Sequence, residues 1–169
     1  MTTIQKKICL LGDFAVGKTS LVRRYVEGRF EDKYLSTVGV KIVRRSLPRE
    51  YGTLNLLIWD LAGSDEFSRT AASYLRGAAG ALIVCDLTRP ETLASLPNYA
   101  EMLRTQTAAA PLIFLGNKAD LTDERLVSEA DLQTVCAAFD SQGWLTSAKT
   151  GDHVDDAFEA LAAALEKQA

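Results

Sequence analysis

The chain has 169 residues, of which 47% are hydrophobic and 24% are charged, so we expect one compact domain over residues 1–169 with a substantial core. Its net charge of −3 and pI near 5.2 argue against a general affinity for nucleic acid or anionic lipid. No apolar run approaches the length of a membrane span, and residues 1–3 lack an export pattern. We therefore expect a cytoplasmic protein with no nucleic-acid partner.

In chain order, the apolar runs and helical spacings predict a strand at 8–11, a helix at 18–27, strands at 41–47 and 53–60 around a turn at 48–52, a strand at 81–86, a helix at 93–103, a strand at 112–115, a helix at 130–139 and a short strand at 144–146. Strands buried on both faces and alternating with helices indicate an α/β fold with a mostly parallel sheet. The hairpin adds one antiparallel edge. In such sheets ligands bind at the carboxyl ends of the strands.

The C-terminal stretch carries apolar residues at i, i+3, i+4 and i+7, at Val154, Ala157, Phe158, Leu161 and Leu165. This stripe fits either a core-packing helix face or a helix that binds a partner or membrane surface. Few basic residues accompany it, which favours the core-packing face.

Three cysteines, Cys9, Cys85 and Cys136, lie far apart, and the first two sit inside apolar runs. Small buried thiols are the usual occupants of such places. A disulfide framework or metal site would need paired or close spacing. The pattern fits a reducing cytoplasm.

A glycine-rich motif follows the first apolar run and precedes the first helix. It reads Gly12-Asp13-Phe14-Ala15-Val16-Gly17-Lys18-Thr19 and is followed by Ser20. A loop of this type turns successive N–H groups toward phosphate oxygens, with the positive helix end behind them. Lys18 would neutralise the β- and γ-phosphates, and the Thr19 hydroxyl would bind Mg²⁺.

A second motif ends the strand at 53–60, where Asp60 is followed three residues later by Gly63. A carboxylate beside the phosphate loop can complete the oxygen coordination of Mg²⁺. Gly63 has no Cβ and would let its N–H approach a γ-phosphate.

A third set of residues indicates the base. Asn117-Lys118-Ala119-Asp120 follows the strand at 112–115, and Ser147-Ala148-Lys149 follows the strand at 144–146. Guanine presents a ring N–H and an amine side by side, and the Asp120 carboxylate can accept from both. Adenine offers the opposite pattern, which disfavours an ATP-dependent kinase or ATPase.

With these motifs in order, the sequence resembles the Ras superfamily of small GTPases, and its Rab-like branch most closely. The segments that carry the resemblance are 11–13, 16–20, 34–40, 58–60, 74–78 and 116–121. The resemblance implies a phosphate-loop NTPase fold with six strands and about five helices. It also implies two switch regions, 30–40 and 62–76, that bind effector proteins, with an exchange factor and possible activating protein as regulators.

The resemblance assigns further roles to single residues. Thr37 corresponds to the switch threonine that binds Mg²⁺ and the γ-phosphate, and Phe30 to the aromatic that packs against guanine, although a core aromatic is the alternative. Lys118 corresponds to the lysine that lies along the base and braces the phosphate loop. Ala148 corresponds to the residue whose N–H meets the guanine carbonyl. Lys18, Thr37, Gly63 and the residue at 64 would form the catalytic group.

Two departures concern hydrolysis. The family normally has a water-orienting glutamine where this chain has Ser64, and prefers small residues where it has Phe14 and Ala15. Serine lacks an amide to bridge water and phosphate, and a phenyl ring would crowd both the water and an inserted arginine. We expect slow GTP hydrolysis. Asp65 or Glu66 could instead replace the missing function, a partner could supply both groups, or the chain could be a GTP-locked interaction module.

Three surface features leave alternatives open. Trp59, Ile42 and Tyr74 correspond to Rab effector contacts, with ordinary packing as the alternative. The arginines at 23, 24, 29, 44 and 45 could meet an acidic partner, but a solvated face is favoured. The sequence stops at 166–169 with no cysteine after Cys136. A lipid anchor is therefore either absent or lies outside this sequence, and without one a partner would bring the protein to a membrane.

Overall fold

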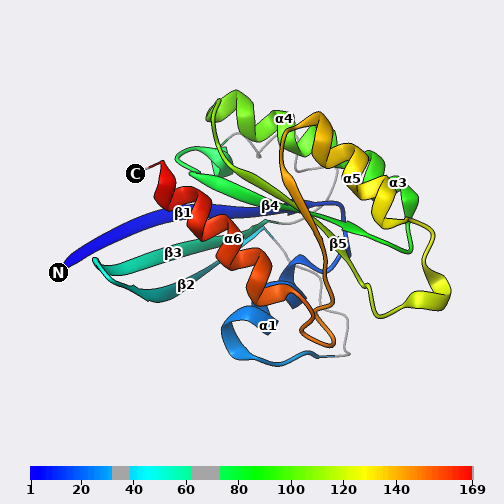
Figure 1. Ribbon diagram of the computed structural model, residues 1–169, viewed down its shortest axis with the longest axis horizontal. Coiled ribbons are helices and arrows are strands. Elements are labelled where there is room, and N and C mark those ends of the chain that lie inside the picture. The colour runs from blue at the N-terminus through cyan, green and yellow to red at the C-terminus, as the bar shows by residue number, and fades with distance from the viewer. Residues whose placement is uncertain (32–38, 62–72, 169) are drawn as a thin grey trace.

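The computed structural model describes residues 1–31, 39–61 and 73–168, and Figure 1 shows their arrangement. One six-stranded sheet has the order β2-β3-β1-β4-β5-β6. Its strands are β1 (Thr2–Gly12), β2 (Val40–Arg49), β3 (Gly52–Leu61), β4 (Gly80–Asp86), β5 (Leu112–Asn117) and β6 (Gln142–Leu145). Thr37, Gly63 and Ser64 lie outside the described residues.

The sheet is parallel except at one edge. β1 pairs in parallel with β3 and β4, and β4, β5 and β6 continue the parallel order. β2 pairs antiparallel with β3 at the edge. The predicted mostly parallel sheet with one antiparallel hairpin is therefore confirmed.

β1 begins earlier than the apolar run predicts. Its first half pairs with β3 alone, in a register that places Thr2 opposite Gly52. The pairing with β4 starts only at Ile8. Residues 2–7 thus belong to a strand with one neighbour, where polar side chains such as Lys6 can face water.

Five α-helices lie within the described residues: α1 (Lys18–Glu27), α3 (Pro90–Ala94), α4 (Leu96–Gln106), α5 (Glu129–Ala138) and α6 (Val154–Lys167). α1 and α6 cover one face of the sheet, and α3, α4 and α5 cover the other (Figure 1). The carboxyl ends of β1, β3, β4 and β5 then meet at one edge. None of the helices in the described ranges is both long and apolar enough to cross a bilayer.

The predicted helix at 93–103 is divided in the structure. α3 ends at Ala94 and α4 begins at Leu96, with Ser95 between them. Pro97 has no N–H to donate to the carbonyl of Leu93, so a continuous helix would lack that hydrogen bond.

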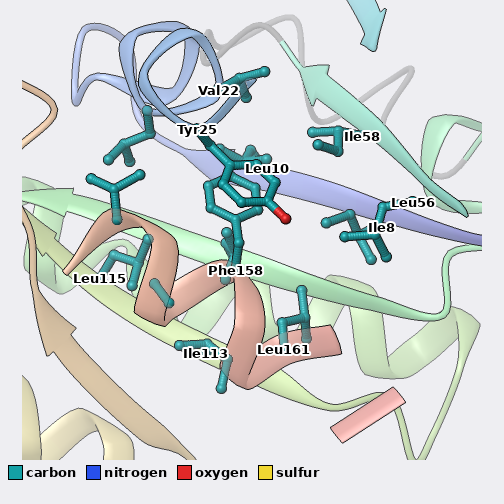
Figure 2. Close-up of a cluster of buried hydrophobic side chains, with 14 of the residues drawn as sticks. Ile8, Leu10, Val22, Tyr25, Leu56, Ile58, Ile113, Leu115, Phe158 and Leu161 are labelled. Carbon is teal, nitrogen blue, oxygen red and sulfur yellow. The ribbon is translucent and has the colours of Figure 1, made fainter. Parts of the chain in front are cut away.

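One half of the core lies between the sheet and α1 with α6 (Figure 2). The Tyr25 ring of α1 stacks on the Phe158 ring of α6, with centroids 4.0 Å apart and planes 3° from parallel. The apolar stripe of α6 is buried: Val154, Ala157, Phe158, Leu161 and Leu165. The core-packing interpretation of this helix is confirmed.

The other half of the core lies under α4 and α5 and includes all three cysteines. Cys9, Cys85 and Cys136 are all buried and free. Burial raises the pKa of Cys9 and Cys85 to about 12. These are unreactive core thiols, as the sequence predicts.

Candidate nucleotide-binding site

The phosphate loop (residues 12–19) runs from the carboxyl end of β1 into the first turn of α1. Its two glycines leave no space for a side chain. A Cβ at Gly12 would lie 2.4 Å from the Val84 carbonyl oxygen, and one at Gly17 would lie 2.3 Å from Asn117 Nδ2. Gly17 also has φ of +104°, which other residues rarely adopt.

Lys18 lies inside this loop. Its ammonium donates to the carbonyl oxygens of Gly12 at 2.9 Å and Asp13 at 3.0 Å. Burial lowers the pKa of Lys18 to about 8, with Asp60 and Asp13 opposing the shift and Arg89 adding to it. A buried ammonium held by neutral carbonyls is suited to receive a phosphate charge.

Two further loop carbonyls are held from outside the loop. Arg89 Nη1 donates to the Phe14 oxygen at 2.9 Å, and Asn117 Nδ2 donates to the Val16 oxygen at 3.0 Å. In a planar trans peptide the N–H points opposite to the carbonyl. The N–H of each following residue therefore turns away from these contacts, which is the arrangement of an anion-binding loop.

Thr19 and Asp60 bring two oxygen ligands together from positions 41 residues apart. Thr19 Oγ1 donates to Asp60 Oδ2 at 2.6 Å, and Asp60 is fully buried at the end of β3. Hydroxyl and carboxylate oxygens fit Mg²⁺, which keeps several waters and binds substrate phosphates. No group of three or more His, Cys, Asp or Glu side chains suited to a metal occurs among the described residues.

Asn117 connects the phosphate loop to the base side of the site. It ends β5, is 2% exposed, and also accepts a hydrogen bond at Oδ1 from Thr146 Oγ1 at 3.1 Å. Both ends of its side-chain amide are therefore engaged by protein groups. The structure gives this predicted nucleotide residue a bracing position between two loops.

Asp120 and Ser147, which belong to the two predicted base motifs, lie in hydrogen-bond contact. Ser147 Oγ donates to Asp120 Oδ1 at 2.7 Å and accepts from the Thr150 N–H at 3.1 Å. Ala148 follows at 4% exposure.

Arg24 of α1 holds the loop at residues 147–149, which carries the second base motif. The sequence does not suggest this role. Its Nε donates to the Ala148 oxygen at 2.9 Å and its Nη2 donates to the Lys149 oxygen at 2.6 Å. Arg23, by contrast, lies 3.5 Å from Glu27. The Arg23 side chain is only 13% exposed, so the favoured interpretation of the arginine group as a solvated face holds for neither Arg23 nor Arg24. It fits Arg29, whose side chain is 56% exposed.

Asp86 is a second residue missing from the predicted site. It ends β4, is fully buried, and forms an ion pair of 2.9 Å with Lys118. Burial by itself raises the pKa of Asp86, but hydrogen bonds from Thr88 and Lys118 outweigh it and leave this pKa below its ordinary value. Its place at a strand's carboxyl end was the available sequence signal.

Several predicted residues point elsewhere or remain peripheral. The Asp13 carboxylate accepts from Ser95 Oγ at 2.6 Å and Tyr99 Oη at 2.9 Å, so it faces α4. Phe30 packs on the core under α1, in line with the core-aromatic alternative. Phe14 is 52% exposed.

The sheet order, the phosphate loop and the paired oxygens of Thr19 and Asp60 define a phosphate-loop nucleotide-binding protein. A model of the Ras family matches residues 7–167. The chain is 38% identical over 165 residues to GTP-binding protein ypt5 of Schizosaccharomyces pombe, covering 96% of this chain and 78% of that protein. It is 36% identical over 159 residues to mouse Ras-related protein Rab-22A, covering 94% and 82%.

This chain belongs to the Ras family, with Rab-related proteins among its relatives. The resemblance seen in the sequence is confirmed. Membership makes a GTP-binding switch the supported general function.

Proposed function

We propose that this protein is a Mg²⁺-dependent GTP/GDP switch that hydrolyses GTP slowly. One observation supports the nucleotide class above all. The buried Lys18 and the Thr19–Asp60 pair lie at the same sheet edge as the Asp120–Ser147 pair, with Asn117 joining the two sides. Phosphate, metal and guanine groups of one nucleotide would each meet a fitting partner there.

We expect GTP hydrolysis to be slow because of the residues at two positions, Ser64 and Phe14. In hydrolysis a water attacks the γ-phosphorus, and the bond to the oxygen that leaves with GDP breaks. Ser64 is too short to bridge that water to the phosphate. Phe14 places a half-exposed ring on the phosphate loop, where an arginine inserted by a partner would have to pass.

Ser64→Gln tests the assignment. Supplying one water-positioning hydrogen bond should raise the single-turnover rate about tenfold or more, equivalent to about 1.4 kcal/mol in the barrier. Ser64→Ala is the matched control and should leave the rate unchanged. An unchanged rate in Ser64→Gln would show that Ser64 is not the limiting defect, and would favour Asp65, Glu66 or a partner as the source of the function.

A GTP-locked interaction module is the second candidate, favoured by the same two residues. Nucleotide released from freshly purified protein, before and after hours in Mg²⁺, distinguishes the two. GTP that decays slowly to GDP identifies a slow switch, and GTP that persists identifies the locked module. Adenine nucleotide would contradict both.

We infer that effectors dock beside the hairpin when the switches order. Ile42 is 52% exposed and lies opposite Trp59 in the β2–β3 register. The ring centroids of Tyr74 and Trp59 lie 6.5 Å apart. Lys7 Nζ lies over the Trp59 ring, 3.6 Å from its centroid. Ile42→Asp should weaken effector capture without changing GDP affinity. An exchange factor, an activating protein and peripheral membrane recruitment through a partner complete the proposal.

A further inference from the structure

We propose that Arg89 is a positioning residue of the phosphate loop, which holds the Phe14–Ala15 peptide so that the Ala15 N–H faces the nucleotide phosphates. This inference rests on the proposed function. Arg89 Nη1 donates to the Phe14 carbonyl at 2.9 Å across 75 residues of sequence. Because the peptide is planar, fixing that carbonyl outward fixes the next N–H in the opposite direction.

The Phe14–Ala15 peptide lies in the part of the phosphate loop that the Lys18 ammonium contacts. Lys18 Nζ bonds the carbonyl oxygens of Gly12 and Asp13, which immediately precede the Phe14–Ala15 peptide. The ammonium of such a loop reaches the β- and γ-phosphates. The Ala15 N–H would therefore lie near those phosphates in the bound state.

This peptide needs external support because Ala15 is strained. Its φ is +63°, in the left-handed region that disfavours residues with a Cβ. Rotating the Phe14–Ala15 peptide by half a turn would return this φ to the ordinary negative range. The same rotation would aim the Phe14 carbonyl oxygen at the phosphates and replace a donor by an acceptor. Local preference thus opposes the binding conformation, and such strain persists only where surrounding contacts hold it.

Arg89 is itself held firmly enough to supply that contact. It precedes Pro90, the first residue of α3, and its carbonyl accepts from both the N–H and the hydroxyl of Thr92 at 3.0 and 2.7 Å. Its guanidinium lies 3.7 Å from Asp86 and 3.3 Å from Glu91. A charged donor also polarises the amide it binds, which strengthens the N–H at the other end.

Asp86 extends the support to the base side. It pairs with Lys118 at 2.9 Å, and Lys118 also has a positive φ, of +67°. The chain Phe14–Arg89–Asp86–Lys118 therefore joins the strained residues of two loops. The Val16–Gly17 peptide has a separate support in Asn117, so Gly17 serves as an internal reference.

The first test compares GDP release from the Mg²⁺-bound wild type, Arg89→Ala and Arg89→Lys. Losing the charged hydrogen bond should speed GDP release about tenfold in Arg89→Ala. The effect should be smaller in Arg89→Lys, which keeps a charged donor group. Arg104→Ala is the control, because Arg104 donates at 3.1 Å to the carbonyl of Phe139, the residue directly after α5. Release from that variant should match the wild type.

The second test uses the strain argument. Glycine adopts positive φ without penalty, so Ala15→Gly should make the support less necessary. Arg89→Ala in the Ala15→Gly background should change GDP release less than threefold relative to Ala15→Gly alone. An undiminished tenfold effect there would overturn the inference.

The third readout is the amide proton of Ala15 in the GDP-bound protein, seen by NMR with ¹⁵N-labelled alanine and glycine. In Arg89→Ala it should move upfield and exchange faster with solvent, while the Gly17 amide stays in place. Faster GDP release with an unmoved Ala15 amide would reduce Arg89 to a general stabiliser and overturn the inference. So would unchanged release. If the wild type does not bind GDP, the proposed function itself is wrong. If the wild type binds GDP but the Arg89 variants behave as above, only the inference about Arg89 is wrong.

Discussion

At the scale of single residues, the site depends on side chains that hold backbone atoms as much as on those that would touch the nucleotide. Arg24, Arg89 and Asn117 each donate to loop carbonyls. Their contribution is geometric, because each fixes the direction of a peptide. The two arginines are charged donors, so their bonds are stronger than the bond from the neutral Asn117 amide.

Asp120→Asn should reverse the base preference. Ser147 Oγ donates to Oδ1, so an asparagine that keeps this bond presents its NH₂ where the second carboxylate oxygen lies. That group donates, which suits the carbonyl of xanthine and repels the amine of guanine. We expect GDP affinity to fall about 100-fold or more and xanthosine diphosphate to bind, measured by competition. Adding Ser147→Ala to Asp120→Asn should weaken the preference for xanthosine diphosphate. An unchanged GDP affinity in Asp120→Asn alone would show that Asp120 does not recognise the base.

At the scale of elements, α6 holds the sheet and α1 together. The Phe158 ring stacks on Tyr25 and belongs to one cluster with strand residues from β1, β3 and β5 (Figure 2). α1 in turn carries Lys18 and Thr19 in its first turn. Packing at α6 therefore supports the position of the phosphate loop.

Phe158→Ala should lower the free energy of unfolding by about 3–5 kcal/mol, because it leaves a cavity where a stacked ring is fully buried. Urea unfolding of the two proteins measures the difference. Leu126→Ala is the control, since Leu126 is 69% exposed, and should change the value by less than about 0.5 kcal/mol. A similarly small effect of Phe158→Ala would mean that α6 does not contribute to the core as described.

At the scale of the whole molecule, one sheet edge gathers loops from five strands, so a nucleotide would connect parts that are distant in sequence. A ligand that binds the folded state alone stabilises it by mass action. Ligand-dependent stability is therefore a direct check on the nucleotide class.

GDP with Mg²⁺ at 100 times its dissociation constant should stabilise the protein by about 2.7 kcal/mol, which raises Tm by about 5–10 °C for a chain of this size. ADP at the same concentration should leave Tm unchanged, because Asp120 would face the wrong edge of adenine. Thermal unfolding followed by circular dichroism measures both. Equal stabilisation by the two nucleotides would contradict guanine specificity, and stabilisation unaffected by EDTA would contradict the metal role of Thr19 and Asp60.

By itself the sequence determined the order of strands and helices, the hairpin, the buried stripe of α6 and the positions of the phosphate and base motifs. These are local properties, since periodicity and loop motifs repeat within a few residues. Their shared edge also followed, because parallel strands place their carboxyl ends together. Family resemblance added the roles at residues 37, 63 and 64, which lie outside the described residues.

Only the tertiary structure decided which side chains support those motifs. Arg89 reaches Phe14 across 75 residues, and Arg24 reaches Ala148 across 124. Only the tertiary structure shows that Asp13 faces α4 and that residues 2–7 pair with β3. Such contacts depend on how helices and strands pack rather than on local preference. An arginine beside a proline or within a basic helix face carries no local sign of the carbonyl it will hold.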